Sequence, residues 1–87
     1  MLIISTSNRV KRMIADAMRV HVRDVLLDVS LVDDFGMDSL VFVELVMDIE
    51  HELDIQLDDI DLQRVVTVRD LVKLVRVAVK NKQAMAA

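Results

Sequence analysis

The stretch that decides the fold is "DDFGMDSLVFVEL", residues 33–45, which contains Gly36, the only glycine among 87 residues. Glycine adopts positive φ angles that other residues avoid, so Gly36 predicts a sharp turn. Ser39 follows three residues later, directly after Asp38. Aspartate is a preferred N-cap and suits the positive end of a helix dipole. We therefore predict that a helix begins at Ser39.

This predicted helix runs to about Leu53 and carries two apolar strips. The first follows helical spacing and is expected to be buried: Phe42, Leu45, Val46, Ile49 and Leu53. The second lies about a third of a turn away: Leu40, Val43 and Met47, flanked by Glu44, Glu50 and His51. Either the helix lies between two neighbours and both strips are core, or the second strip and its acidic rim face a partner.

Two further long helices flank this one. The first is expected to start near Thr6–Asn8, with Ser7 or Asn8 as its N-cap, and to end near His21. The last begins after Thr67, where Asp70 completes a capping box with a shorter acid. Both have an apolar face at helical spacing: Val10, Met13, Ile14, Ala17 and Met18 in the first, and Val68, Leu71, Val72, Val75 and Val79 in the last.

The connections carry weaker helical signals. We expect a short helix near Asp59–Arg64 and a turn of helix around Leu31–Asp34. No segment alternates long enough to form a sheet, so the fold class is all-α, a small bundle of three main helices plus a short fourth. A single domain spans residues 1–87, with an ordered core of about 7–80, a frayed tail at 81–87, and a frayed or docked N-terminal "MLIIS".

The charges are arranged in blocks behind a net charge of −4. Residues 1–23 hold five basic residues and one acid, residues 24–61 hold thirteen acids and no Lys or Arg, and residues 62–87 hold six basic residues and one acid. The acidic middle repels phosphate backbones, which disfavours nucleic acid as a partner. It either attracts proteins with basic patches or is simply a solvated face.

Several kinds of site are excluded. The chain has no cysteine, so disulfides and thiolate metal sites are impossible. His21 and His51 lack ligand spacing, and Ser39 is not in a Gly-x-Ser-x-Gly elbow. The acids Asp54, Asp58, Asp59 and Asp61 lie close together, but their segment lacks the mid-loop glycine and the terminal glutamate of a calcium-binding loop.

No segment has the length of a membrane span. We expect a cytoplasmic monomer that is not an enzyme and binds no metal.

A longer segment, "FGMDSLVFVELVMDIEHELDIQL" (35–57), resembles the acyl carrier proteins of fatty-acid and polyketide synthesis. The matching motif is Gly36, Asp38, Ser39 and Leu40, and the match continues through Val43–Met47. The resemblance extends from about Arg9 to Val79, because "RVKRMIADAM" is similar to the family's first helix, "SLVDDFG" to its loop, and "VVTVRDLV" to the start of its last helix.

The resemblance implies that Ser39 carries 4′-phosphopantetheine, attached from coenzyme A by a phosphopantetheinyl transferase that Asp38 assists. Other implied partners are acyl-loading and acyl-processing enzymes with basic patches. The implied docking face is Leu40, Val43, Glu44, Met47 and Glu50. The implied acyl pocket is Leu31, Val46, Leu53, Leu57, Leu62, Val65 and Leu71.

Departures from the family pattern favour a specialised carrier over a housekeeping one. Val41 stands where an acid is common, Phe42 where a small or polar residue is common, and Leu57 where a proline is common. Three other interpretations remain: an aminoacyl or D-alanyl carrier, a helical adaptor that uses the acidic face and is never modified, and a small acidic metal-binding protein.

Overall fold

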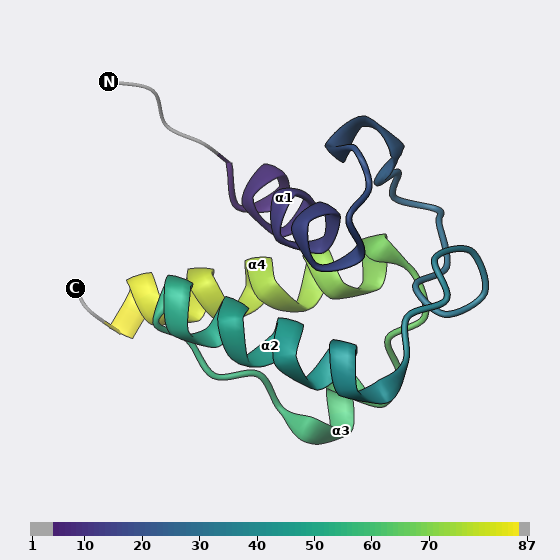
Figure 1. Cartoon of the computed structure of the whole chain (residues 1–87). Helices are drawn as coiled ribbons and strands as arrows, with labels where there is room; N and C mark the ends of the chain where they lie inside the picture. The colour runs from purple at the N-terminus through teal and green to yellow at the C-terminus, as the bar shows by residue number, and fades with distance from the viewer. Residues whose placement is uncertain (1–4, 86–87) are drawn as a thin grey trace.

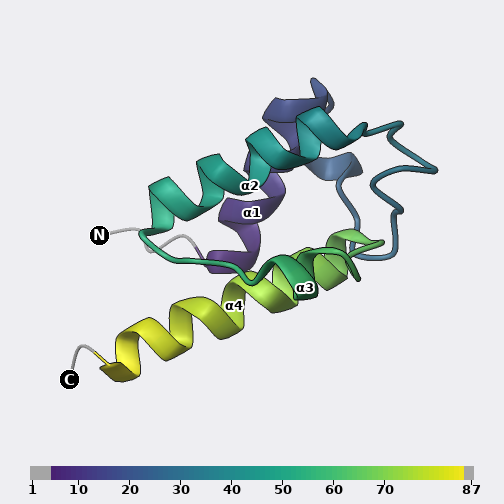
Figure 2. The same cartoon turned by 90° about the horizontal axis from the view of Figure 1, so that it is seen from below.

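A computed structural model describes residues 5–85 of the chain; residues 1–4, and with them the predicted behaviour of "MLIIS", lie outside it, as do residues 86–87. The elements are α1 (Thr6–Met18), the 3₁₀ turn η1 (Val22–Asp24), α2 (Ser39–Leu53), α3 (Asp59–Leu62) and α4 (Val68–Met85). Figures 1 and 2 show α1, α2 and α4 packed together with short α3 beside them. The predicted all-α bundle is confirmed. None of the helices within 5–85 is both long and apolar enough to cross a membrane.

The start of α2 is built as the sequence predicts. Gly36 adopts φ +68°, and its N–H donates to the carbonyl of Val32 at 2.8 Å. Asp38 is extended, and its Oδ1 accepts the N–H of Val41 at 2.8 Å, which caps the helix. An L side chain at position 36 would meet no atom within 4 Å. The glycine is therefore favoured by its backbone angle and not by lack of space.

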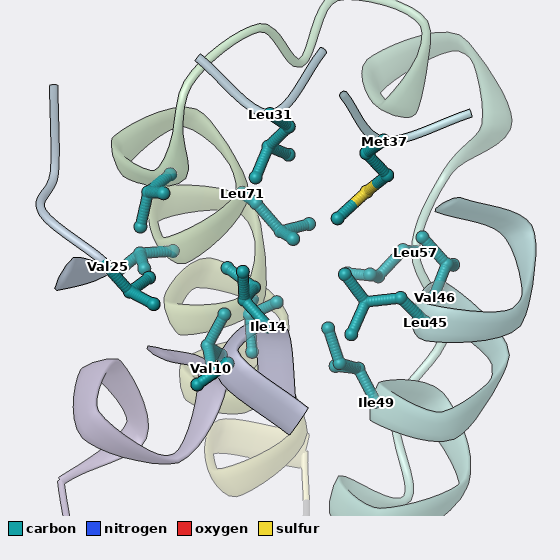
Figure 3. Packing of buried hydrophobic residues seen from close by; sticks show 14 of the residues in the cluster. Val10, Ile14, Val25, Leu31, Met37, Leu45, Val46, Ile49, Leu57 and Leu71 are labelled. Carbon is teal, nitrogen blue, oxygen red and sulfur yellow. The ribbon is translucent and has the colours of Figure 1, made fainter. Parts of the chain in front are cut away.

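The core gathers apolar side chains from the three long helices and from the connection before α2 (Figure 3). From the first strip of α2, Leu45, Val46 and Ile49 are buried, while Phe42 and Leu53 are half-buried. The second strip is exposed by 66% at Leu40, 52% at Val43 and 61% at Met47. This strip is not core, which decides the question that the sequence leaves open.

Helix α1 differs from the prediction at both ends. Its N-cap is Ser5, not Ser7 or Asn8, because the Ser5 hydroxyl accepts the N–H of Asn8 at 3.1 Å. The helix ends at Met18, not near His21, because Arg19 adopts the left-handed conformation at φ 56°. The η1 turn that follows was not predicted from the sequence.

Of the two short helical segments, only α3 is shorter than predicted. Helix α3 ends at Leu62 instead of Arg64, and it is capped by the Asp58 carboxylate on the N–H of Ile60 at 2.8 Å. The segment 31–35 forms consecutive hydrogen-bonded turns in place of a turn of regular helix.

Helix α4 continues to Met85, into the segment that the sequence predicts as a frayed tail. The Lys82 ammonium donates to the Leu53 carbonyl at 3.2 Å and pairs with the Asp54 carboxylate at 3.1 Å. These contacts tie the last turns of α4 to the C-terminus of α2. The cation also lies beside carbonyls that carry the negative end of the α2 dipole.

Backbone hydrogen bonds hold the long connection against the start of α4. The N–H of Leu31 donates to the Val66 carbonyl at 3.0 Å, that of Val68 to Val29 at 3.0 Å, and that of Arg69 to Leu27 at 2.9 Å. Ser30 and Thr67 thereby form an isolated antiparallel bridge.

The predicted capping box of α4 is confirmed. The N–H of Asp70 donates to the Thr67 hydroxyl at 3.2 Å, and Asp70 Oδ2 accepts the N–H groups of Thr67 at 3.0 Å and Val66 at 2.9 Å. The hydrogen bonds from the Thr67 and Val66 N–H groups favour the ionised carboxylate and lower the pKa of Asp70 below its ordinary value.

We predict that Asp70→Ala lowers the free energy of unfolding by about 1 kcal/mol at neutral pH, as loss of a helix cap does. Because the folded state holds the lower pKa, this contribution is present above the ordinary aspartate value of about 3.9 and is lost as the pH falls through the folded value. Urea unfolding at a series of pH values measures the difference. Asp48→Ala, an exposed change within α2, serves as the control and should stay within about 0.5 kcal/mol. A gap between wild type and Asp70→Ala that persists unchanged in acid would contradict the assignment.

Candidate functional site

Ser39 is the first residue of α2, and its side chain is exposed. The first N–H groups of a helix lack partners within the helix, and the macrodipole adds positive potential there. Asp38 uses its carboxylate to cap this end, so it fixes the point at which α2 starts and hence the position of Ser39. The arrangement presents a hydroxyl to solvent where a phosphate group would be stabilised.

A groove of about 640 Å³ opens directly beside Ser39, between α2, α3 and the connection before α2. Its apolar lining includes Leu31, Met37, Phe42, Val46, Leu62 and Val65. Ser39 itself lines the groove together with Asp38 and Glu50. A chain attached to the Ser39 hydroxyl therefore has an apolar surface within immediate reach.

The sequence-predicted pocket agrees with this groove in part. Leu31, Val46, Leu62 and Val65 line it, whereas Leu53, Leu57 and Leu71 do not. Leu71 is fully buried in the core, and Leu57 is 9% exposed and lines a different cleft, against α4. The pocket that the resemblance implies thus includes core residues outside the groove, and their part in sheltering a chain stays a prediction.

The predicted pocket lacks five apolar residues that line the groove: Val32, Met37, Phe42, Val43 and Met47. Met37 lies between the turn glycine and the helix cap and is 3% exposed. Phe42 was assigned to the core strip, but it lies one helical turn after Ser39 on the groove side. Its spacing of three residues from the serine was the available signal.

The predicted docking residues divide into two groups. Leu40, Val43, Glu44 and Met47 are exposed on α2. Glu50 is half-buried, and its Oε2 accepts the N–H of Leu57 at 2.8 Å. Glu50 therefore holds the loop between α2 and α3 against the groove, which Val43 and Met47 also line.

The remaining polar groups do not form a second centre. His21 and His51 are exposed. Within residues 5–85 no group of three or more histidines or acids is placed to hold a metal ion. The acids that the sequence analysis considered for calcium make local contacts, since Asp58 caps α3 and Asp54 pairs with Lys82.

Comparison with known proteins agrees with this geometry. A family model described as "Phosphopantetheine attachment site" matches residues 8–75. The acyl carrier protein of Desulforapulum autotrophicum is 42% identical over 74 residues, covering 84% of this chain and 96% of that protein. The acyl carrier protein of Thermotoga maritima is 40% identical over 68 residues, covering 78% of this chain and 84% of that protein. The chain belongs to the acyl carrier protein family.

Solved structures of carriers share the fold. A structure described as an acyl carrier protein of Mycobacterium tuberculosis superposes with a TM-score of 0.79 at 32% identity, covering 84% of this chain and 97% of that one. The solution structure of an oxytetracycline acyl carrier protein gives a TM-score of 0.71 at 22% identity, covering 94% of this chain and 88% of that one. This second likeness is one of fold alone.

Family membership establishes two properties. The protein is a carrier and not an enzyme, and it bears a covalently attached 4′-phosphopantetheine group. An exposed hydroxyl at a helix N-terminus, opening onto an apolar groove, fits such a group chemically.

We predict that Glu50→Ala destabilises the carrier by about 1–2 kcal/mol, because the half-buried N–H of Leu57 loses its acceptor. Glu44→Ala is the matched control, since Glu44 is an exposed acid on the same helix, and it should change stability by less than about 0.5 kcal/mol. Urea unfolding measures both, and amide exchange at Leu57 should accelerate only in Glu50→Ala. Equal effects of the two substitutions would show that the Glu50 contact has no role in the loop.

Proposed function

We propose that Ser39 is the attachment point and that the protein carries acyl intermediates as thioesters on the arm. The observation that carries this proposal is the exposed Ser39 hydroxyl at the first residue of α2, on the edge of the groove. When bound, the arm supplies the thiol that the cysteine-free chain lacks.

The residues around Ser39 have separate roles in this proposal. Asp38 Oδ1 accepts the Val41 N–H as the helix cap, and the same carboxylate would assist the phosphopantetheinyl transferase through the metal ion of that enzyme. Gly36 shapes the turn that leads into the cap, and Leu40 supplies the first apolar contact beside the attachment point. The N-terminus of α2 stabilises the phosphodiester.

The groove shelters the acyl chain next to its attachment point. Its apolar walls are aliphatic side chains with Met37, Phe42 and Met47, and methionine repacks around ligands of different shape. We infer that Phe42, where the family often has a small or polar residue, narrows the choice of acyl chain. This supports a specialised carrier of a fatty-acid, polyketide or related pathway over a housekeeping one.

The exposed strip Leu40, Val43 and Met47, with Glu44, is the docking face for the transferase and for acyl-processing enzymes. Apolar centres with a charged rim are typical of protein interfaces. Exposed charge pairs are weak and screened by salt, so these complexes are short-lived and salt-sensitive. The carrier acts as a cytoplasmic monomer that visits several enzymes in turn.

The attachment proposal predicts that incubation with coenzyme A, magnesium and a promiscuous phosphopantetheinyl transferase adds one phosphopantetheine and one titratable thiol. Ser39→Ala should abolish both gains. Ser7→Ala is the matched control, since Ser7 also lies in the first turn of a long helix, and it should be modified like the wild type. Intact mass and thiol titration provide the two readouts.

A folded wild type that gains nothing from an active transferase would refute the proposal and favour the unmodified adaptor. Modification that persists in Ser39→Ala would place the arm on another residue. Modification with an amino acid instead of an acyl group in the subsequent loading step would favour the aminoacyl or D-alanyl carrier.

The docking proposal predicts that Val43→Asp lowers the kcat/KM of the transferase by at least about tenfold, because a charge replaces an apolar contact at the interface centre. Val22→Asp is the control, since Val22 is similarly exposed, at 45% against 52%, but lies in η1. Circular dichroism confirms folding. An equal loss of kcat/KM in the two variants would show that the exposed strip of α2 is not the docking face.

A further inference from the structure

Helix α4 carries a row of exposed cations along one edge. Arg69, Lys73, Arg76 and Lys80 are spaced i, i+4, i+7 and i+11, and all four are exposed. At 3.6 residues per turn these positions fall on one side of the helix over about 16 Å. We call this set the basic stripe.

Three of these cations border a shallow groove of about 500 Å³. Lys73, Arg76 and Lys80 line it together with Val77, Val79 and Gln83 of α4 and Thr6 of α1. No acid contributes to this lining. From Leu71 to Met85, α4 has no Asp or Glu at all, while Val77 is 57% exposed. The surface therefore combines one sign of charge with accessible apolar side chains.

Within residues 5–85, Lys73, Arg76 and Lys80 form no ion pair, although the Lys73 ammonium helps to lower the pKa of Asp70. Arg69 pairs with Asp28, and the other ion pairs within residues 5–85 are Arg9–Glu52 and Lys82–Asp54. The positive potential of Lys73, Arg76 and Lys80 is thus available to an external anion.

The acids of α2 lie elsewhere on the molecule. Figure 2 shows α2 and α4 on opposite sides of the view, with α1 between them. The shortest extent of the bundle is 20 Å, and at 0.1 M salt the Debye length is about 10 Å, so charges on opposite sides of the bundle are screened from one another. An anionic surface that approaches the stripe therefore feels the cations more strongly than the distant acids.

We propose that the basic stripe docks the protein on an anionic membrane surface. Lipid phosphates pair with Lys73, Arg76 and Lys80, the long aliphatic stems lie along the headgroups, and Val77 reaches the boundary with the acyl chains. The exposed strip Leu40, Val43 and Met47 of α2 is a different surface. The carrier can therefore bind an enzyme through α2 while α4 is held at the membrane.

The composition of the stripe favours a membrane over other anionic partners. Binding of single-stranded nucleic acid uses aromatic side chains for stacking, and α4 has none. The groove also contains the polar side chains of Thr6 and Gln83, but every charged group that lines it is a cation. A uniformly basic helix face with apolar side chains is typical of interfacial binding.

The test measures partitioning of the full-length protein onto vesicles of phosphatidylcholine with and without phosphatidylglycerol, by cosedimentation at low ionic strength. Binding should require phosphatidylglycerol and decrease with added NaCl. Arg76→Gln/Lys80→Gln should weaken partitioning by about 25-fold, at about fivefold for each cation near the surface. Arg19→Gln/Arg23→Gln removes two exposed cations outside the stripe and gives the same net charge, so it should change partitioning by less than about threefold.

Equal losses in the two double variants would overturn the proposal, because net charge alone would then explain the binding. Equal binding to neutral and anionic vesicles would overturn it as well. So would binding of poly-L-glutamate without binding of anionic vesicles, since that result assigns the stripe to an acidic protein. Ser39→Ala should bind vesicles like the wild type, which separates this test from that of the attachment site.

Discussion

The structure depends on the backbone hydrogen bonds that join residues 27–31 to residues 66–69. These bonds link segments more than thirty residues apart in an otherwise helical protein. They fix Leu31 in the core, and the N–H of Met37 then donates to the Leu31 carbonyl at 3.0 Å. Gly36 and Asp38 consequently turn the chain into α2 at a defined place. The position of Ser39 beside the groove follows from this non-local constraint, because a free connection of that length would leave the helix start unspecified.

The acidic middle of the chain combines structural and surface roles. Asp38 and Asp58 cap helices, and Glu50 fixes a loop N–H beside the groove. Glu44, by contrast, is exposed on α2. Acids that cap helices suit the positive dipole end, which offsets part of their mutual repulsion. The concentration of negative charge is therefore partly a consequence of many helix starts and tight loops within a short segment, and only the remainder is available for recognition.

Much of the fold was predictable because its signals are local. The bounds of α2 follow from Gly36, Asp38 and the apolar strip, and the Thr67–Asp70 capping box was recognisable from spacing. The end of α1 could not be predicted from the sequence, because Arg19 takes a left-handed conformation usually adopted by glycine. The bridge between Ser30 and Thr67 could not be predicted either, because pairing of distant segments leaves no periodic pattern in the sequence. The prediction of Ser39 as the site stays a prediction, and Leu53, Leu57 and Leu71 of the predicted pocket do not line the groove beside it, because burial alone does not identify a cavity.

Gly36 has a consequence for how this sequence can diverge. Its φ of +68° opposes any L-amino acid, yet the space around it is open, so the cost of substitution comes from handedness and not from volume. That cost is about 1–2 kcal/mol for most residues and smallest for asparagine and aspartate, which tolerate left-handed angles. A lineage with a stability reserve can therefore lose this glycine and still form the turn. The glycine marks the turn without being indispensable to it, so relatives that lack it can keep the same helix start.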